Sequence, residues 1–158
     1  MKTLRTAFCS LFLFGLLVAP PAQAQTPWEL GPLLGVNLDN DNLLLGAVAR
    51  IHLPSAPITL NPGLELYPGI DDGSLFVVNF DVQYELEAAS IDPYVGAGIS
   101  WATRTSDTRD TNTDFGLNLK GGLLFSLMGS ARPYVEAAVN IGGGGALIFR
   151  GGFLFTIG

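Results

Sequence analysis

Apolar and polar residues alternate along most of this chain with a period of two. In the stretch 76–86, every even-numbered residue is apolar or aromatic, whereas Asn79, Asp81, Gln83 and Glu85 fill four of the five odd-numbered positions. Successive side chains of a β-strand point to opposite faces, so this stretch has one face suited to hydrocarbon and one suited to water. The pattern predicts a strand that separates two environments.

Eight such segments of about ten residues, a length typical of tilted membrane strands, are divided by turn-forming clusters. We expect strands near residues 28–38, 43–53, 58–68, 75–86, 93–102, 115–125, 133–141 and 146–157. The fold class predicted is all-β: an eight-stranded antiparallel up-and-down transmembrane β-barrel. The polar stretch 103–114 is expected to be its longest loop.

One face of every segment is apolar. It comprises the even-numbered residues of 28–38, 58–68 and 76–86 and the odd-numbered residues of 43–53, 93–101, 115–125, 133–141 and 147–157, and none of them carries a charge, an amide, an imidazole or an aliphatic hydroxyl. The opposite face is rich in glycine and holds the charged residues. Together with His52, those residues are Glu29, Arg50, Glu65, Asp81, Glu85, Lys120, Glu136 and Arg150.

The apolar face is predicted to point outward, into lipid. An eight-stranded barrel has an interior only just wide enough for ordinary side chains, and the many aromatic residues of the apolar face would overfill it. The polar face has too few charges to cover a soluble protein. An Arg or Lys facing lipid at mid-bilayer would cost about 2–4 kcal/mol, which explains why the apolar face has none. A soluble lipid-binding barrel is the alternative.

Aromatic residues on the apolar face are expected to form two girdles at the membrane interfaces. With the first strand starting on the periplasmic side, one girdle comprises Trp28, Tyr84, Phe125 and Phe155, and the outer girdle comprises Phe76, Trp101 and Phe115. Pro32 and Pro62 lack a backbone donor inside predicted strands, so we expect a bulge, a missing hydrogen bond or a break at each.

The first residues are typical of an export signal. Lys2 and Arg5 precede an apolar run, and Ala22-Gln23-Ala24 forms a small-residue cleavage site, so residues 1–24 are expected to be a signal peptide and 25–158 the barrel domain. The single cysteine, Cys9, lies within the signal. Cleavage would leave six basic against fourteen acidic residues, a formal charge of −8, which argues against a nucleic-acid partner.

The charged residues of the polar face are predicted to form a network inside the barrel. A confined interior penalises an unpaired charge, so Arg50, Lys120 and Arg150 are each expected to contact an acid. Such a network would plug the lumen and exclude a wide channel, while a narrow or gated pore for ions or small solutes stays open as an alternative. No cofactor or metal is expected, because the acidic loop clusters lack metal-loop spacing.

His52 is the only histidine, with Ser55 in the following turn. A lipid hydrolase needs a nucleophile, a base and an orienting carboxylate that converge where an acyl chain can reach, and the spacing here matches no such pattern. A hydrogen-bonded lumen histidine is the favoured interpretation, and a lipid-modifying enzyme is the less favoured alternative.

Two motifs resemble the small outer-membrane β-barrel superfamily of OmpA-, OmpX- and opacity-type proteins: Pro93-Tyr94-Val95-Gly96-Ala97-Gly98-Ile99, and Arg132-Pro133-Tyr134-Val135-Glu136-Ala137. Near the end of the chain, Arg150, Gly152, Phe155 and Ile157 look like the assembly signal of the last strand in these families. The chain departs from them in ending with Gly158 and in placing Ile157 where an aromatic residue is usual.

The resemblance covers the whole chain after the signal. It implies a protein in the outer membrane of a Gram-negative-type bacterium. The polar-free outer face further favours a non-enzymatic, monomeric barrel with a structural or surface-interaction role. Outer-membrane lipid would surround it, and the barrel assembly machinery and periplasmic chaperones would be its transient partners.

Overall fold

The computed structural model describes residues 28–54, 56–70, 73–86, 88, 90–106, 111–126, 131–142 and 146–157. The predicted signal peptide, its cleavage site and Ser55 lie outside these ranges. Among the described residues, no helix is long and apolar enough to cross a membrane.

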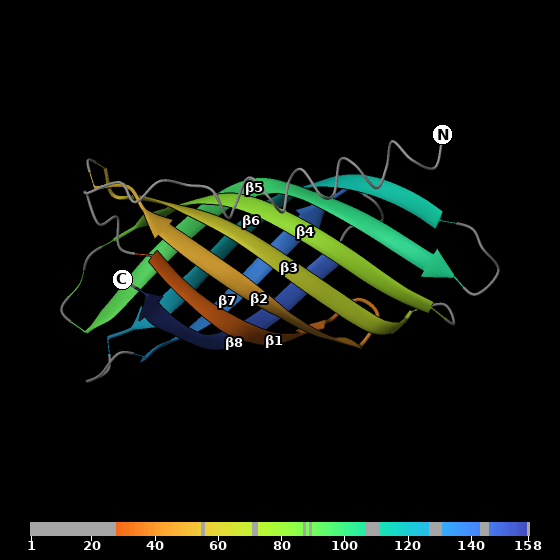
Figure 1. Ribbon diagram of the computed structural model, residues 1–158, viewed down its shortest axis with the longest axis horizontal. Coiled ribbons are helices and arrows are strands. Elements are labelled where there is room, and N and C mark those ends of the chain that lie inside the picture. The colour runs from red at the N-terminus through yellow and green to blue at the C-terminus, as the bar shows by residue number, and fades with distance from the viewer. Residues whose placement is uncertain are drawn as a thin grey trace.

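Eight antiparallel strands close into a barrel, which confirms the predicted fold class (Figure 1). Each strand pairs with the next in sequence, and the last pairs back onto the first. The strands are β1 (Trp28–Asn37), β2 (Asn42–His52), β3 (Ile58–Ile70), β4 (Gly73–Glu85), β5 (Ile91–Ser106), β6 (Thr111–Phe125), β7 (Ala131–Ile141) and β8 (Ala146–Ile157).

The two ends of the barrel differ. At one end, here called the terminal end, Trp28 of β1 pairs with Ile157 of β8. At the opposite, distal end, β1 turns into β2, β3 into β4, β5 into β6 and β7 into β8. In the predicted membrane orientation, the terminal end would face the periplasm.

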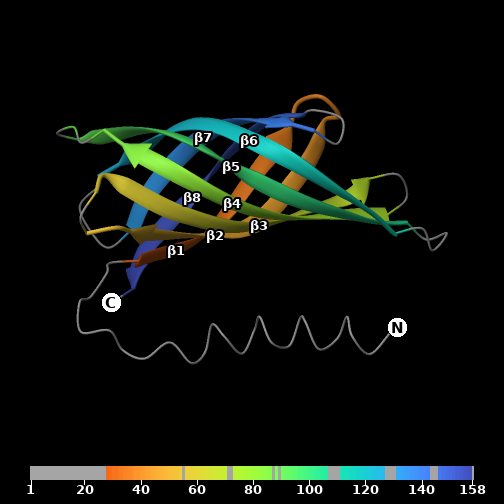
Figure 2. The same ribbon diagram turned by 90° about the horizontal axis from the view of Figure 1, so that it is seen from above.

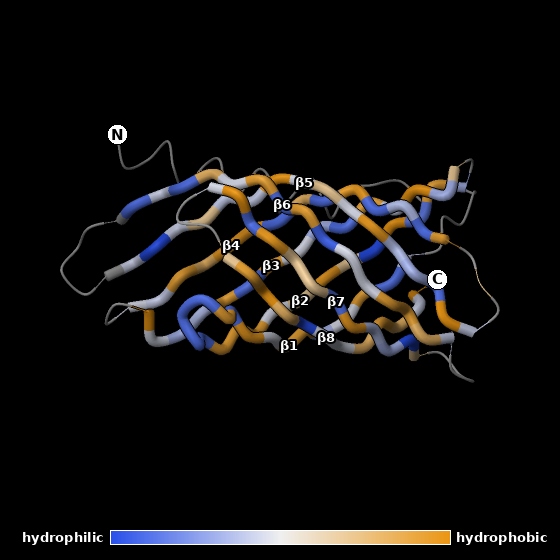
Figure 3. Tube along the Cα trace, turned by 180° about the vertical axis from the view of Figure 1, so that it is seen from behind, coloured by the Kyte–Doolittle hydropathy of each residue, from blue (hydrophilic) through white to orange (hydrophobic). Residues whose placement is uncertain are grey.

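The alternation of the sequence becomes an outside and an inside. Every residue of the predicted apolar face is exposed or half-exposed, with Leu34 at 69%, Leu43 at 71% and Phe115 at 69%. Apolar and polar residues alternate along each strand in Figure 3. Among the described residues, every exposed charged side chain lies at the distal end: Asp39, Asp41, Arg104 and Asp114. The wall of the barrel is therefore apolar outside and polar within, the reverse of a soluble barrel.

The interior also holds apolar side chains that the sequence analysis did not single out. They include the buried leucines Leu33, Leu44, Leu124 and Leu154 and the buried tyrosines Tyr67, Tyr94 and Tyr134. These residues sit at polar-face positions of the alternation, so they fill the lumen between the charged groups.

The prediction of a loop at residues 103–114 is wrong for most of these residues. Strand β5 continues to Ser106 and β6 begins at Thr111, with Thr103 opposite Thr113. Both faces of this segment are polar, so hydrophobic alternation did not reveal it, but threonine is β-branched and favours strands. Because β7 pairs with β6 only from Leu117 onward, β3 to β6 extend past the other strands at the distal end (Figure 2).

Pro32 and Pro62 each coincide with an interruption in a ladder. Pairing of β1 with β8 stops at Leu30 and resumes at Leu33, on either side of Pro32. Pairing of β2 with β3 skips Pro62 in the same way, without a change of register. There the Asn61 side-chain amide donates to the carbonyl of Ala49 at 2.9 Å, which supplies a hydrogen bond where proline has no N–H.

Candidate functional site: the lumen

A buried ion-pair network crosses the middle of the lumen. Arg150 of β8 donates through Nε to Glu136 Oε1 at 2.5 Å and through Nη1 to Glu65 Oε1. Lys120 Nζ lies 2.7 Å from Asp81 Oδ2 and 3.5 Å from Glu136 Oε2. All five residues are at most 8% exposed. The network joins strands β3, β4, β6, β7 and β8 across the barrel.

Neutral groups complete this central network. Lys120 Nζ donates to Asn61 Oδ1 at 2.5 Å, and the Tyr94 hydroxyl donates to Glu136 Oε2 at 2.8 Å. Tyr67 donates to Glu65 Oε2 at 2.7 Å. Glu65 and Glu136 therefore each accept from a phenol as well as from a cation, and Asp81 accepts from the Asn118 amide beside Lys120. These hydrogen bonds offset part of the cost of burying the carboxylates.

Glycine makes room for these side chains. Gly98 pairs directly with Asp81, and a Cβ at Gly98 would meet the Asp81 side chain and the carbonyl oxygen of Phe80. The Tyr94 ring stands over Gly122, its cross-strand partner, where a Cβ would meet Cζ and the hydroxyl. The glycine-rich lumen face is thus a packing requirement of the network.

A second cluster lies nearer the terminal end. Arg50 Nη2 donates to Glu85 Oε1 at 2.7 Å, and its guanidinium stands 5.2 Å from the centre of the Tyr94 ring. Arg132 donates to Glu29 Oε1 at 2.9 Å and to Asp92 Oδ2 at 3.0 Å. The cations and acids of the lumen are therefore paired at both levels.

Arg132 and Asp92 were not among the predicted lumen residues. The sequence analysis placed both in connectors, but each immediately precedes an apolar-face proline, Pro133 or Pro93. Extending the alternation by one residue would have assigned both side chains to the lumen. The same parity identifies Thr59, Asn61, Asn79, Gln83 and Asn118, which are buried and hydrogen-bonded inside the barrel.

His52 belongs to the terminal cluster. Its Nε2 lies 3.2 Å from Glu29 Oε2 and its Nδ1 lies 3.2 Å from Thr59 Oγ1. This order of hydroxyl, imidazole and carboxylate is that of a hydrolytic triad, but Thr59 is 2% exposed and donates its proton to Glu85. The arrangement satisfies buried polar groups. Because the Thr59 proton points to Glu85, His52 is not placed to act as a base toward this hydroxyl. Within the described ranges, no group of three His, Cys, Asp or Glu residues could hold a metal ion.

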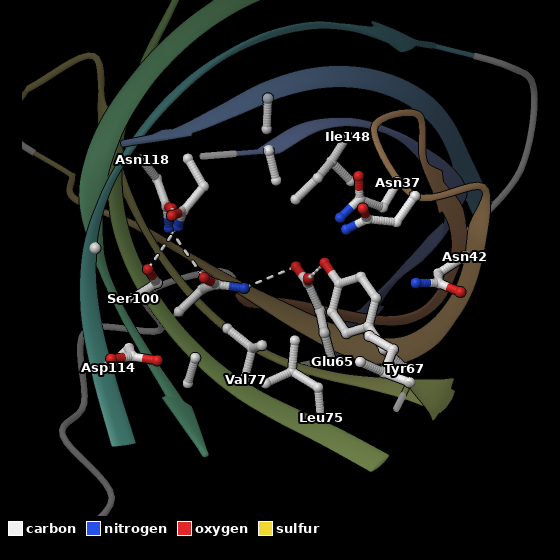
Figure 4. A pocket seen from close by; sticks show the side chains of 18 of the residues that line it. Asn37, Asn42, Glu65, Tyr67, Leu75, Val77, Ser100, Asp114, Asn118 and Ile148 are labelled. Atoms are coloured by element: carbon white, nitrogen blue, oxygen red, sulfur yellow. Dashed lines mark hydrogen bonds between the residues drawn. The ribbon is translucent and has the colours of Figure 1, made fainter. Parts of the chain in front are cut away.

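The distal part of the lumen is a cavity of about 610 Å³ (Figure 4). Its floor is formed by Glu65 and Arg150 of the central network, and it reaches the distal rim at Arg104 and Asp114. A smaller cavity of about 20 Å³ lies inside the network and is lined by Arg50, Gln83 and Lys120, among others. Neither cavity is lined by His52 or Thr59.

The predicted girdle residues lie at the two ends of the barrel. Trp28, Tyr84 and Phe155 are exposed and Phe125 is half-exposed at the terminal end, whereas Phe76, Trp101 and Phe115 are exposed at the distal end. Trp101 and Phe115 are cross-strand partners whose ring centroids are 5.5 Å apart. In the predicted assembly signal, Arg150 is buried, Gly152 is half-buried, and Phe155 and Ile157 are exposed. These positions are observed, while the roles of the girdles and of the assembly signal stay predictions.

No model of a known protein family matches this chain, and no curated protein matches it either. Among solved structures, it is similar to the N-terminal β-barrel domain of Pseudomonas aeruginosa OprF, with a TM-score of 0.70 and 18% identity over 84% of this chain and 98% of that one. A structure from the de novo design of transmembrane β-barrels matches with a TM-score of 0.60 and 15% identity over 84% and 96%. Neisserial surface protein A matches with a TM-score of 0.52 and 11% identity over 82% and 92%.

The fold defined by the closed meander, the apolar exterior and these matches is that of the small eight-stranded outer-membrane β-barrels. The resemblance predicted from the sequence motifs is confirmed at the level of fold.

Proposed function

We propose that this protein is an integral outer-membrane β-barrel of non-enzymatic function, with a structural or surface-interaction role and a lumen closed by its ion-pair network. The observation that carries the proposal is the exposed face of the closed barrel, which is apolar around all eight strands. In water such a surface would drive association, and in lipid it needs no partner. Closure pairs β1 with β8, so no strand edge is left along the main barrel wall.

The proposed location is supported by the similarity to two solved structures, the N-terminal β-barrel domain of Pseudomonas aeruginosa OprF and Neisserial surface protein A. Outer-membrane lipid would contact the apolar face, and the last strand would engage the barrel assembly machinery after periplasmic chaperones deliver the chain. A monomer is proposed because the barrel closes on itself.

Fractionation of cells that express the whole chain, followed by gel electrophoresis with and without boiling, tests this proposal. We expect the protein in the outer-membrane fraction, with unboiled and boiled samples migrating differently, because a barrel whose backbone bonds are satisfied internally resists detergent. Variant Ile99→Arg, which places a cation on the lipid face, should reduce the folded form. Recovery of the mature chain in the soluble periplasm would contradict the proposal.

A narrow or gated pore is the second candidate, favoured by the distal cavity that leads down to the central network. Planar-bilayer recordings of the purified barrel separate the two candidates. We expect no discrete conductance from the unaltered protein, because Arg150 and Lys120 bridge acids on several strands. Steady unitary currents would favour the pore.

The non-enzymatic part of the proposal is supported by the buried hydroxyl of Thr59 beside His52. It is tested by comparing the outer-membrane lipids of cells with the protein, without it and with His52→Ala. Identical lipid profiles are expected, and a modified lipid that disappears in the His52→Ala strain would contradict this part.

A further inference from the structure

The distal cavity is a feature of the barrel to which the proposed function assigns no role. Its volume of about 610 Å³ lies within the usual range of small-molecule sites, which is roughly 300–1,000 Å³. It is walled by strands and needs no rearrangement to form. Its lining combines two kinds of surface, and together they define a class of ligand.

One side of the cavity is a chain of neutral amides. Asn140 of β7 donates through Nδ2 to Ser100 Oγ and to Asn118 Oδ1, both at 2.7 Å. Asn118 donates in turn to Asn79 Oδ1 at 2.9 Å, and Asn79 donates to Glu65 Oε1 at 2.7 Å (Figure 4). Along this series each asparagine side chain donates to the next one. The side-chain oxygen Oδ1 of Asn140, the first asparagine of the series, therefore accepts from no described residue. This oxygen is an open acceptor on the cavity wall.

The facing side supplies open donors. Asn37 of β1 is 7% exposed and its Oδ1 accepts from the backbone N–H of Asp39 at 3.0 Å, which leaves Nδ2 without a partner in the described part of the chain. Asn42, its cross-strand neighbour, also lines the cavity, and its side-chain amide likewise has no partner there. Both amides border the cavity, where a ligand that accepts and donates hydrogen bonds can reach them.

The charged and apolar residues that line the cavity restrict the class of ligand further. The only charged side chains among the described lining residues are Glu65 and Arg150, which pair with each other, and Arg104 and Asp114 at the rim. An ion would therefore find no uncompensated partner on the floor. Between the floor and the distal rim, the cavity also has apolar wall residues: Ile70, Leu75, Val77, Ala102, Ala146 and Ile148.

We propose that the distal cavity is a binding site for a small neutral polyhydroxylated ligand, a mono- or disaccharide. Hydroxyl groups both donate and accept, so they match the open Asn140 carbonyl and the open Asn37 and Asn42 amides. The C–H faces of a sugar ring pack against the apolar wall residues. The site depends on the cavity alone and holds whether or not the barrel conducts.

Titration of the purified full-length barrel in detergent, observed by NMR of its asparagine side-chain amides, tests the site. The probes are maltose and N-acetylglucosamine, with glucuronate as a charged comparison and hexanol as an apolar one. We expect saturable shifts of the Asn37, Asn42 and Asn140 amide signals with at least one neutral sugar, and no shift at Asn61, which lies in the central network. Saturation by glucuronate or hexanol alone, or no saturable shift with either sugar, would overturn the proposal.

Matched substitutions locate the binding. Ala102→Phe fills the cavity, and Ala97→Phe places the same ring on the exposed outer face of the same strand. We expect Ala102→Phe to weaken sugar binding by about tenfold or more, which corresponds to about 1.4 kcal/mol, and Ala97→Phe to leave it unchanged. Asn37→Ala, which removes the open donor together with the acceptor of the Asp39 N–H, should also weaken binding and serves if Ala102→Phe fails to fold. Equal affinity in Asn37→Ala and the unaltered protein would place the sugar elsewhere and overturn the proposal.

Discussion

Glu136 and Arg150 are direct partners in the β7–β8 pairing, and Arg150 Nε donates to Glu136 Oε1 at 2.5 Å inside the barrel. The same guanidinium reaches Glu65 on β3, on another part of the barrel wall. A cross-strand pair set by local register is thereby joined to a contact that exists only because the sheet closes.

Replacement of Arg150 by methionine should destabilise the folded barrel by about 3–5 kcal/mol, because Glu65 and Glu136 would stay buried after losing a cation. Urea-dependent unfolding from lipid vesicles measures this change. The control is Arg104→Met at the exposed distal rim, where loss of a surface cation should cost about 1 kcal/mol or less. Equal effects of the two substitutions would contradict a central role for the network.

An arginine at Ile99 should cost about 2–4 kcal/mol of folding free energy in vesicles, because Ile99 is 57% exposed and lies on the predicted lipid face. The measurement is reversible unfolding of Ile99→Arg in bilayers. Asn112→Arg, on the exposed distal extension of β6, is its control and should change stability by much less. Should Ile99→Arg be as stable as Asn112→Arg, lipid does not contact this face.

The two tryptophans of the barrel should sit at opposite membrane interfaces. Trp28 is 39% exposed at the terminal end and Trp101 is 52% exposed at the distal end, positions that suit the amphipathic indole ring. Single-tryptophan variants Trp28→Phe and Trp101→Phe, studied with lipids that carry a quencher at known depth, report each ring separately. Both rings should be quenched most by shallow labels. Maximal quenching of either ring from the bilayer centre would remove it from a girdle.

A water molecule should occupy the 20 Å³ cavity inside the network. Within the part of the chain that the structure describes, Arg50 Nε and Nη1 and Gln83 Oε1 are buried without hydrogen-bond partners. Nη1 lies 4.0 Å from Glu29 Oε2. A cavity of this size holds one water, which could accept from Arg50 or donate to Gln83. A high-resolution crystal structure checks this directly, and an empty cavity beside the Arg50 Nε and Gln83 Oε1 atoms would contradict it.

Alternation identified the strands and their faces well because a period of two is a local property of extended backbone. It failed at residues 103–106 and 111–114, where both faces are polar, and at Arg132 and Asp92, where it was stopped one residue too early. At 103–106 and 111–114 the β-strand geometry continues after the hydrophobic signal that marks it has ended, whereas at Asp92 and Arg132 the alternation itself continues.

The eight charged residues and His52 that were predicted for the lumen all lie on the inner side of the barrel wall, yet their partners could not be predicted. Lys120 of β6 contacts Asn61 of β3, and Arg150 of β8 contacts Glu65 of β3, between strands that are not neighbours in the sheet. The sequence by itself determined which side chains face inward, because that depends on parity along one strand. Only the tertiary structure decided which of them meet and where a cavity is left, because closure and register bring distant strands together across the lumen.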